Sequence, residues 1–292
     1  MIVVRLTGGL GNQLFQYAMG RYHSLRHSVE LVLEDSFYID PPADSTPRQY
    51  DLDKYPIVAR RSNAEERHAW RSYTGRISKR FRRFVDFPGP FIYVHERPGQ
   101  FNSNVNELGD GIFLDGYWQS ERYFPGIQAS LYADFLPLLP MLSEDTRISA
   151  IMKARQSISL HIRRGDYVSN IAANTIHGVC GLDYYDRAIR YMVERQTDPV
   201  FFIFSDDMQW VKKNLVINYP HVFVEHNSST KAFQDLRLMS QCNHHILANS
   251  SFSWWGAWLN PSAEKLIVRP RTWFVGLPQT STWACPEEWA AI

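Results

Sequence analysis

Cysteine is scarce in this chain, and the spacing of the few that occur excludes two classes of small-domain architecture. The 292 residues include three cysteines, Cys180, Cys242 and Cys285, and no CxxC pair. An odd number of widely spaced cysteines indicates reduced thiols, because a disulfide framework or a zinc site needs paired or clustered ones. Such usage is typical of a cytoplasmic protein.

Long apolar runs are also missing. No window approaches the roughly 20 apolar residues that a membrane-spanning helix requires. The opening stretch MIVVRLTGGLG has no charged segment before a long apolar run, so we expect no secretory signal. These features predict a cytoplasmic protein that touches a membrane at most from its surface.

Charge of either sign is nearly balanced over the chain, whose formal net charge is +1. A nucleic-acid footprint spread over the whole protein is thereby excluded. Residues 60–86 are the exception, with nine Lys/Arg and three Asp/Glu, a local net charge of +6. This segment suits a peripheral contact with the cytoplasmic face of the inner membrane or with a diphosphate-linked lipid acceptor, and a solvated helix face is an equally good interpretation.

Several short catalytic motifs are absent. Neither GxSxG nor GxxxxGK[ST] occurs, so an α/β-hydrolase and a P-loop enzyme are unsupported. The stretch DLD at 51–53 resembles a metal-binding DxD, but no strand precedes it, and we interpret it as a coincidence. The adjacent histidines His244 and His245 begin a strand and are expected to be structural. We predict no bound metal.

Short β-branched runs alternate with helical periodicity along most of the chain. The first half opens with a strand-like run at 2–6, then the turn TGGLG, a helical pattern and a second strand at 29–35. In the second half, strand-like runs lie at 157–164, 200–207, 222–226, 244–251 and 265–270. This alternation predicts parallel, doubly wound sheets in two domains, 1–150 and 151–292. Residues 36–110 give no clear pattern.

Three strands of the second half end in polar clusters, HIRRGD, FSDD and ANSS. Ligands of open parallel sheets bind outside the carboxyl ends of the strands, so these clusters should line one crevice. Strand alternation puts Arg163 on one face with His161, while Arg164 lies at the strand exit. Paired guanidinium groups match a diphosphate. The alternative is an internal salt bridge with Asp166 or Asp207, which we expect for one arginine rather than for both.

Two further clusters suit an anion or a sugar. Ser250 and Ser251 precede a helix-like run, where hydroxyls and free backbone N–H groups form an anion site, and a plain helix cap is an equal alternative. Asp206 and Asp207 could hold ribose or sugar hydroxyls, and a helix N-terminal pair favoured by the dipole is the alternative.

The loop GGLGNQ near the N-terminus favours a second interpretation of the chain. Gly9 and Gly11 follow a strand, and Glu34 or Asp35 ends the next, as an NAD(P)-binding oxidoreductase requires. Leu14 stands where the third glycine of that fingerprint belongs, so this is the less favoured interpretation. The amides that follow Gly11, those of Asn12 and Gln13, suit sugar hydroxyls.

Several of these motifs together resemble one known family. GGLGNQLFQY, HIRRGDY, FSDD and ANSSFSWWGAWL match the motif set of the bacterial α-1,2-fucosyltransferases, glycosyltransferase family 11, in order and over nearly the whole chain. DGYWQSERYF and HGVCGLDYY fit as well. The resemblance implies a GT-B fold, with two Rossmann-like domains facing a cleft. It further implies an inverting transferase that moves L-fucose from GDP-fucose to the 2-hydroxyl of a galactose in a free or lipid-linked glycan, without a required metal.

The resemblance also implies roles for single residues. Arg163 and Arg164 would hold the pyrophosphate, Ser250 and Ser251 would complete that site, and Asn12 would lie where sugar and acceptor meet. His161 and Asp235 would hold the guanine, although Asp235 alone would be interpreted as an exposed helix carboxylate. The domain up to residue 150 would bind the acceptor and the second would bind GDP-fucose.

The general base stays open at this stage. Asp166, His177 and Asp115 are candidates by their place near strand or motif ends, and Asp166 could instead orient an arginine. A third interpretation, presentation of the tripeptide Arg164-Gly165-Asp166 to an adhesion receptor, conflicts with its position after an apolar strand.

Overall fold

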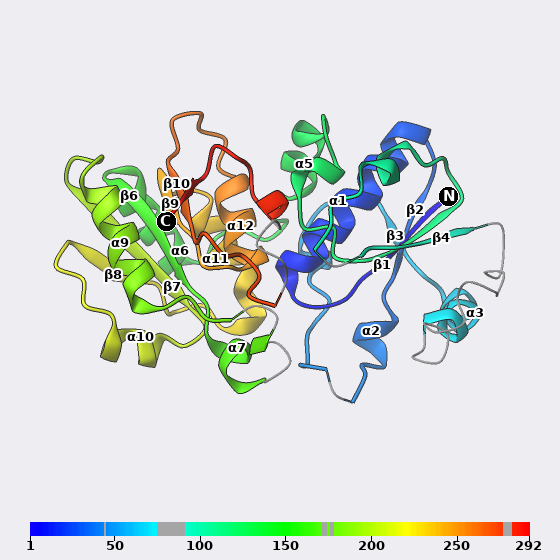
Figure 1. Cartoon of the computed structure of the whole chain (residues 1–292), viewed down its shortest axis with the longest axis horizontal. Helices are drawn as coiled ribbons and strands as arrows, with labels where there is room; N and C mark the ends of the chain where they lie inside the picture. Colours follow the sequence, from blue (N-terminus) through cyan, green and yellow to red (C-terminus); the bar gives the residue numbers. More distant parts are fainter. Residues whose placement is uncertain (44, 75–90, 98, 171–173, 176–177, 277–281) are drawn as a thin grey trace. The chain divides into compact units, whose positions relative to one another are not determined.

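The computed structural model divides the chain into two compact units, Met1–Leu136 and Pro137–Ile292. It describes every residue except 44, 75–90, 98, 171–173, 176–177 and 277–281 (Figure 1). Each unit has its own parallel sheet and its own core, and each is described by itself below.

The N-terminal unit is built on five parallel strands in the order β3-β2-β1-β5-β4. Their bounds are β1 Ile2–Arg5, β2 Leu31–Glu34, β3 Arg60–Arg61, β4 Ile92–His95 and β5 Ile112–Asp115. The helices are α1 Leu10–His27, α2 Ser36–Ile39, α3 Ala64–Thr74 and α5 Gln128–Asp134, with 3-10 turns η1 Leu52–Lys54, η2 Ser103–Glu107 and η3 Glu121–Tyr123. The chain leaves β1 toward β2 on one side and returns to β5 on the other, so the topological switch point lies between β1 and β5.

Helices cover both faces of this sheet because successive residues of the central strand point to opposite sides. On one face Val3 packs in a buried cluster with Trp70 of α3. On the other, Gly20 of α1 lies so close to Val4 that an added Cβ would overlap the valine. This close approach packs α1 directly on the central strand β1.

The C-terminal unit carries six parallel strands in the order β11-β10-β9-β6-β7-β8. They are β6 Gln156–Ile162, β7 Pro199–Ser205, β8 His221–Phe223, β9 His244–Ile246, β10 Ile267–Arg269 and β11 Ala290–Ala291. The helices are α6 Ser143–Lys153, α7 Gly165–Ser169, α9 Leu182–Val193, α10 Met208–Asn214, α11 Ala232–Met239 and α12 Ser251–Trp258, with 3-10 turns η4 Ser229–Lys231 and η5 Thr282–Ala284. Counted from β8, this is the 3-2-1-4-5-6 order of dinucleotide-binding sheets, with its switch point between β6 and β9.

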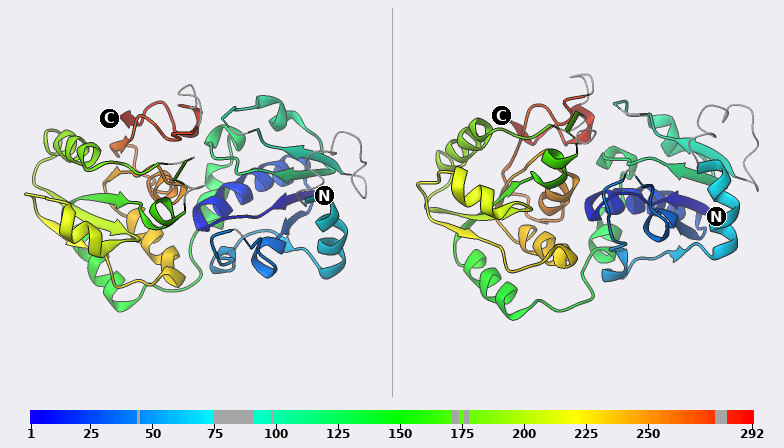
Figure 2. Two further views of the ribbon diagram at one scale, coloured as in Figure 1. Left: turned by 60° about the horizontal axis from the view of Figure 1, so that its bottom comes forward. Right: turned by 90° about the horizontal axis from the view of Figure 1, so that it is seen from below.

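Both faces of the second sheet are covered as well (Figure 2). One face packs Ile158, Leu160 and Ile162 of β6 against the tyrosines of α9. The other packs Phe202 and Phe204 of β7 against α6 and α11. The predicted doubly wound α/β architecture is therefore confirmed for each half of the chain.

The boundary between the units differs from the predicted one. The sequence suggested a division at residue 150, which falls inside α6, whereas the chain divides after Leu136. The reason is packing: Ile148 and Met152 of α6 are buried against Phe202 of β7. A helix that completes this core belongs to the C-terminal unit.

Residues 36–110, which showed no pattern in the sequence, contain two short edge strands, β3 and β4. The two residues of β3 are too few for an alternation to be visible, and β4, with four residues, is partly exposed along its whole length. Across the described ranges, no helix combines the length and the apolar character needed to cross a membrane.

Candidate active site

Two arginines directly follow strand β6 at the switch point of the C-terminal sheet. Arg163 Nη1 lies 3.0 Å from Asp206 Oδ2, and Arg164 Nε lies 3.4 Å from Asp207 Oδ2. The backbone N–H of Arg164 also donates to Asp206 Oδ1, at 2.9 Å. An internal ion pair, expected for one arginine, is thus formed by each of them.

Aromatic rings support the same two guanidinium groups. The Arg164 guanidinium carbon lies 3.6 Å from the ring centroid of Trp210, and that of Arg163 lies 5.4 Å from the ring of Tyr167. Stacking holds a guanidinium by its face and leaves the N–H groups along its edge available to an acceptor. Both side chains stay partly exposed, at 19% and 17%. The pair is therefore held in position and still accessible to an anion.

Asp206 and Asp207, which follow β7, hold the two arginines in position. Asp207 caps α10 by accepting from the backbone N–H of Trp210 at 3.2 Å, so the helix-terminus interpretation is correct for this residue. Asp206 packs so closely on Gly165 that any Cβ there would overlap its Oδ2. The glycine of the Arg-Gly-Asp tripeptide thus has a packing reason, and its arginine is stacked and ion-paired rather than presented at a loop tip.

The polar cluster after β9 forms the start of helix α12. Ser250 is its N-cap and accepts from the backbone N–H of Phe252 at 3.3 Å, as the cap interpretation expected, and Ser251 is the first helical residue. This first turn follows β9, across the switch point from Arg163. Cap and anion site are compatible, because a capped helix still presents N–H groups to a ligand.

His161 is buried inside this edge of the sheet. Its ring centroid lies 5.6 Å from that of Phe252, and 4% of the residue is exposed. Burial, together with the charge of Arg163, lowers the pKa of His161 to about 3, so the imidazole is neutral at physiological pH. A guanine contact, as the resemblance implied, would have to reach a histidine that is almost completely covered.

Asp235 belongs to a carboxylate network that follows β8. The Asn227 side-chain amide donates to Asp235 at 2.9 Å and to the buried Asp145 at 2.8 Å, and His226 Nε2 lies 2.7 Å from the same Asp145 oxygen. Burial raises the pKa of Asp235 to about 7, and the neighbouring Asp145 adds to this while Asn227 and His226 oppose it. Asp235 is half-buried, not the exposed helix carboxylate that its sequence context alone suggested.

At the switch point of the N-terminal sheet, the glycine loop is fixed by side-chain amides. Gln13 is fully buried, and its amide donates to the carbonyls of Gly8 and Gln49 at 3.2 and 2.8 Å while accepting from Asp51 N–H at 2.9 Å. Every hydrogen-bonding group of this amide is used within the unit. Gln13 was expected to bind a sugar, but the structure makes it a positioning residue for the loop.

Asn12 is better placed for a ligand. It follows the buried Gly11, and its Oδ1 accepts from Gln119 Nε2 at 2.9 Å, which joins the motif after β1 to the motif after β5. Gln16 makes a second such link by donating to the Gly116 carbonyl at 3.1 Å. The two motifs on either side of the switch point are therefore built as one surface.

Asp115, one of the three predicted bases, ends β5. Arg5 Nη1 and His95 Nδ1 each lie 3.6 Å from its Oδ2, and the hydroxyl of Tyr93 donates to it. Burial alone would raise the pKa of Asp115, but these three neighbours together hold it well below its usual range. A carboxylate that holds protons so weakly is a poor general base, so the structure disfavours this role.

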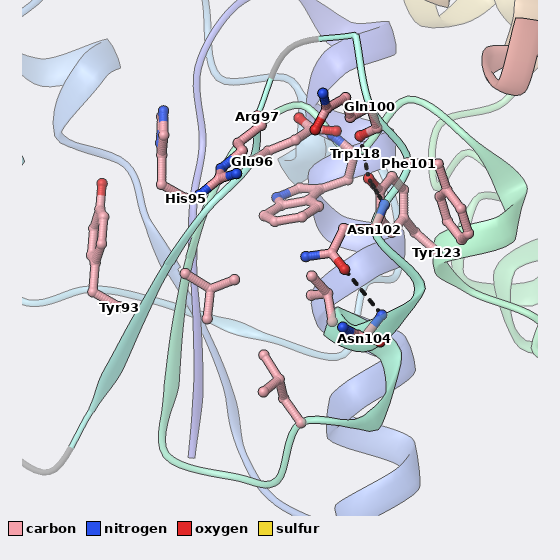
Figure 3. Close-up of a pocket in the computed structure, with 13 residues that line it drawn as sticks. Tyr93, His95, Glu96, Arg97, Gln100, Phe101, Asn102, Asn104, Trp118 and Tyr123 are labelled. Atoms are coloured by element: carbon pink, nitrogen blue, oxygen red, sulfur yellow. Dashed lines mark hydrogen bonds between the residues drawn. The ribbon is translucent and has the colours of Figure 1, made fainter. Parts of the chain in front are cut away.

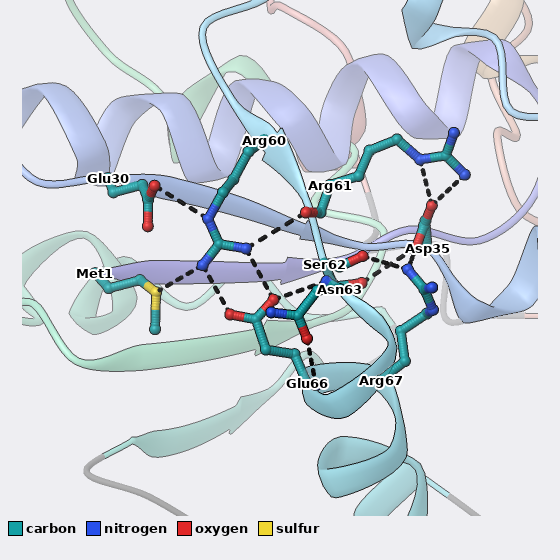
Figure 4. Close-up of polar contacts among 9 residues, drawn as sticks. All are labelled: Met1, Glu30, Asp35, Arg60, Arg61, Ser62, Asn63, Glu66 and Arg67. Carbon is teal, nitrogen blue, oxygen red and sulfur yellow. Dashed lines mark hydrogen bonds and ion pairs between the residues drawn. The ribbon is translucent and has the colours of Figure 1, made fainter.

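The carboxylates at the end of β2 are engaged as well. Glu34 Oε2 lies 3.6 Å from Arg5 Nε, and Asp35 is buried beneath Arg61 and Arg67 with Ser62 donating at 3.1 Å (Figure 4). A dinucleotide fold needs one of these carboxylates directed at a ribose. Neither is available for that purpose here.

Three arginines of the basic segment 60–86, Arg60, Arg61 and Arg67, are paired inside the unit in the same way. Arg60 forms ion pairs with Glu30 at 3.0 Å and with Glu66 at 2.7 Å, as Figure 4 shows. Arg61 and Arg67 both pair with Asp35. These arginines stabilise β3 and α3, and nothing in their arrangement supports the expected membrane contact. The remainder of the segment, from residue 75, lies outside the described residues.

A model of glycosyl transferase family 11 matches residues 100–275, well over half of the chain. An Escherichia coli α-1,2-colitosyltransferase is 34% identical over 100% of this chain and 99% of its own length. The O-antigen biosynthesis glycosyltransferase WbnK of Escherichia coli is 34% identical over 93% of this chain and 94% of its own length.

The chain belongs to glycosyltransferase family 11.

Solved structures show the fold of this family 11 transferase independently. The fucosyltransferase NodZ from Bradyrhizobium superposes with a TM-score of 0.50 at 16% identity, covering 87% of this chain and 91% of that one. The Arabidopsis thaliana protein FUT1, solved with GDP, also superposes with a TM-score of 0.50, at 12% identity, covering 99% of this chain and 75% of that one. The expected GT-B type is confirmed, and the oxidoreductase and adhesion interpretations find no support.

Two of the transferase's predicted site residues stay predictions. His177 lies outside the described residues, and Asp166 is the second residue of the short helix α7, with its side chain outside the described set. His244 and His245 were expected to be structural. The structure confirms this for His245, whose ring nitrogens lie 2.8 Å from Ser159 Oγ and 2.9 Å from Asn260 Nδ2.

The sequence missed several residues of the transferase that the structure brings to the site. Trp210 stacks on Arg164, Asn227 joins two carboxylates, and Gln119 contacts Asn12. Trp210 alone had a local signal, since it stands three residues after the capping Asp207. The other two depend on contacts between distant segments.

Proposed function

We propose that this transferase moves L-fucose from GDP-β-L-fucose to the 2-hydroxyl of a terminal galactose, with inversion at the anomeric carbon and without a metal ion. The observation that carries the proposal is the pair Arg163–Arg164 at the switch point, opposite the start of α12. Full-length similarity to an α-1,2-colitosyltransferase supports the linkage. Similarity to a rat galactoside α-(1,2)-fucosyltransferase, at 31% identity over 86% of this chain and 61% of that protein, supports the linkage and the acceptor class.

The chemistry follows from the charge that develops. The galactose O2 forms a bond to the anomeric carbon while the bond from that carbon to the diphosphate oxygen breaks, and the hydroxyl proton passes to a base. Negative charge builds up on the departing GDP, and donors already fixed by Asp206 and Asp207 stabilise it without reorganisation. Asp166 and His177 are our candidates for the base by their place in the motifs, since Asp115 is disfavoured.

The C-terminal unit is proposed to bind the nucleotide and the N-terminal unit the acceptor. The 3-2-1-4-5-6 sheet and the arginine pair support the first assignment. The paired surface of Asn12 and Gln119 supports the second. Similarity to an O-antigen biosynthesis glycosyltransferase favours an O-antigen or related glycan, free or lipid-linked, as acceptor, and a cytoplasmic site of action.

A second donor is favoured by one specific observation, the 34% identity to a colitosyltransferase over the whole chain. Colitose is L-fucose without its 3-hydroxyl. A site with a hydrogen-bonding group for that hydroxyl rejects the deoxy sugar by a large factor, whereas an apolar site discriminates weakly. Comparing kcat/KM for GDP-L-fucose and GDP-colitose with one galactoside decides between the two donors.

Calorimetric titration with GDP tests the nucleotide site. Arg163→Ala should weaken GDP binding about 10- to 100-fold, because it removes a charge-assisted hydrogen bond to the diphosphate. Arg190→Ala is the matched control, since Arg190 also pairs with an aspartate, at 2.8 Å, but on the exposed face of α9. Binding that persists in EDTA supports the metal-free site. Equal GDP affinity in both variants, or binding of NAD in place of GDP, would refute the proposal.

A further inference from the structure

A cavity of about 590 Å³ lies in the N-terminal unit, away from every residue assigned above except His95 and Tyr93 at its edge. It is formed by the end of β4, the segment that leads into η2, and the turn after β5. Its polar and aromatic lining includes Glu96, Gln100, Phe101, Asn102, Trp118 and Tyr123 (Figure 3). The volume is that of a small-molecule site.

Two buried polar atoms at this cavity have no hydrogen-bond partner within the described structure. They are Oε1 of Glu96 and Nε1 of Trp118. Buried polar groups are satisfied in the great majority of cases, so an acceptor and a donor left over at one cavity call for an explanation. A ligand with hydroxyl groups could satisfy both atoms, because a hydroxyl both donates and accepts.

The backbone around Glu96 is built to hold these atoms where they are. The other carboxylate oxygen of Glu96 accepts from the backbone N–H groups of Tyr117 and Trp118, at 2.6 and 2.9 Å. Trp118 has a φ of 55°, in the left-handed region that non-glycine residues avoid, and a Cβ on Gly116 would overlap both Glu96 and Trp118. Strained backbone that the surroundings hold in place is typical of functional sites.

The lining also defines the chemistry of the occupant. The aromatic rings of Phe101, Trp118 and Tyr123 pack on one another at one wall of the cavity, with the ring centroids of Phe101 and Tyr123 4.8 Å apart. Carboxylate and amide groups lie beside them, with Arg97 as the one Lys or Arg among the lining residues. In Figure 3 Glu96, Trp118 and Asn102 lie on one side of β4, whereas Tyr93 and His95 extend from the other. Aromatic rings beside carboxylate and amide hydrogen-bonding groups suit a pyranose ring, whose C–H face is apolar and whose edge carries hydroxyls.

We infer that this cavity binds an uncharged, non-reacting sugar unit of the acceptor glycan, next to the galactose that receives the transferred sugar. The inference rests on the proposed function. Every lining residue falls between Tyr93 and Tyr123, within the N-terminal unit, so a sugar held there is bound without contributions from the nucleotide-binding unit. Glu96 and Trp118 would then set which glycans are accepted.

The test compares two acceptors with one enzyme. Methyl β-D-galactoside presents only the reacting sugar, whereas N-acetyllactosamine adds the neighbouring unit. In Glu96→Gln, the KM for N-acetyllactosamine should rise about 10-fold, while the KM for methyl β-D-galactoside, kcat and the affinity for GDP stay within about 2-fold. Glu107→Gln is the matched control, because Glu107 is an exposed glutamate of the same unit that pairs with Arg26 outside the cavity.

A second variant guards against misfolding. Phe101→Leu removes an aromatic face and keeps an apolar side chain, and it should give the same KM difference with an unchanged thermal midpoint. An equal rise in KM for both acceptors, or unchanged KM for N-acetyllactosamine in both variants, would overturn the inference. Loss of GDP binding in the wild type would instead refute the proposed function, so the two failures are distinguishable.

Discussion

At the scale of single residues, Asp206 determines how the candidate nucleotide site is held. One oxygen accepts from the backbone of Arg164 and the other pairs with the guanidinium of Arg163. The same oxygen fills the space that a side chain at Gly165 would need. The orientation of Arg163 and the backbone position of Arg164 therefore both depend on Asp206, whose own position requires a glycine at residue 165.

Gly165→Ala should therefore impair catalysis without touching any ligand. Its Cβ would push Asp206 away, and a loosened arginine should lower kcat/KM for the donor by about 10- to 100-fold, in the range found for losing one fixed donor. Gly109→Ala is the control, because nothing lies within 4 Å of the Cβ position there. Steady-state kinetics of the two variants give the comparison, and identical kinetics would contradict the coupling.

Residue types at strand ends were the part of the site that the sequence could predict. Arg163, Arg164 and Ser250 were identified because polar clusters end otherwise apolar strands. Burial could not be predicted in this way: His161 shares a strand face with Arg163 but is covered by Phe252. Its neutral state follows from that covering, which only the folded chain provides.

At the scale of elements, the network around Asp145 joins three segments of the C-terminal unit. Asp145 belongs to the first turn of α6, Asp235 to α11, and Asn227 to the loop after β8, and the Asn227 amide links the two carboxylates. Burial of Asp235, with a smaller contribution from the nearby Asp145, raises the pKa of Asp235 and makes the stability of this unit depend on pH.

Asp235→Asn should change that dependence. Burial raises the folded-state pKa of Asp235 to about 7 from its ordinary value of 3.8. Between these pH values the folded chain keeps a proton that the unfolded chain has released, so the free energy of unfolding of the wild type falls as pH rises through this window. The variant should lose this slope and exceed the wild type in stability above pH 7, with little difference below pH 4.

Urea unfolding at pH 4, 6 and 8 measures the effect. Asp186→Asn is the control, because Asp186 is an exposed ion-pair partner on α9, and its change should stay within about 0.5 kcal/mol. A wild-type slope that survives in Asp235→Asn would assign the pH dependence to another group.

Strands and helices with a recognisable pattern were predicted, whereas two-residue edge strands were not. The strands β6 and β7, with seven residues each, and the amphipathic α9 were visible in the sequence. The edge strands β3 and β11, with two residues each, exist only because neighbouring strands supply hydrogen-bonding partners. No local pattern of two residues can indicate a strand.

At the scale of the whole molecule, each unit has a complete sheet and buried clusters of its own. A fragment spanning 137–292 should unfold cooperatively and bind GDP with nearly the affinity of the full chain. A fragment that starts at the sequence-predicted boundary, 151–292, lacks the buried Ile148 and most of α6. Losing one large buried apolar side chain costs about 2–5 kcal/mol, a large share of the stability of a typical domain.

The two fragments are compared by thermal unfolding and by GDP titration. Cooperative unfolding and GDP binding by 137–292 alone would establish the division after Leu136. Equal behaviour of both fragments would show that α6 is dispensable and that the contact-based boundary has no energetic meaning.

The internal ion pairs of Arg163 and Arg164 should reduce the binding of other cellular anions at this site. Two cations facing two carboxylates form an electrically balanced group when no nucleotide is bound. An unpaired cationic site would attract RNA and free phosphate, because long-range attraction grows with net charge. Arginines that are neutralised by aspartates attract distant anions weakly. Their N–H groups would form hydrogen bonds only with a diphosphate that fits the site. The enzyme should therefore bind polyanions such as RNA more weakly than a site with unpaired arginines would.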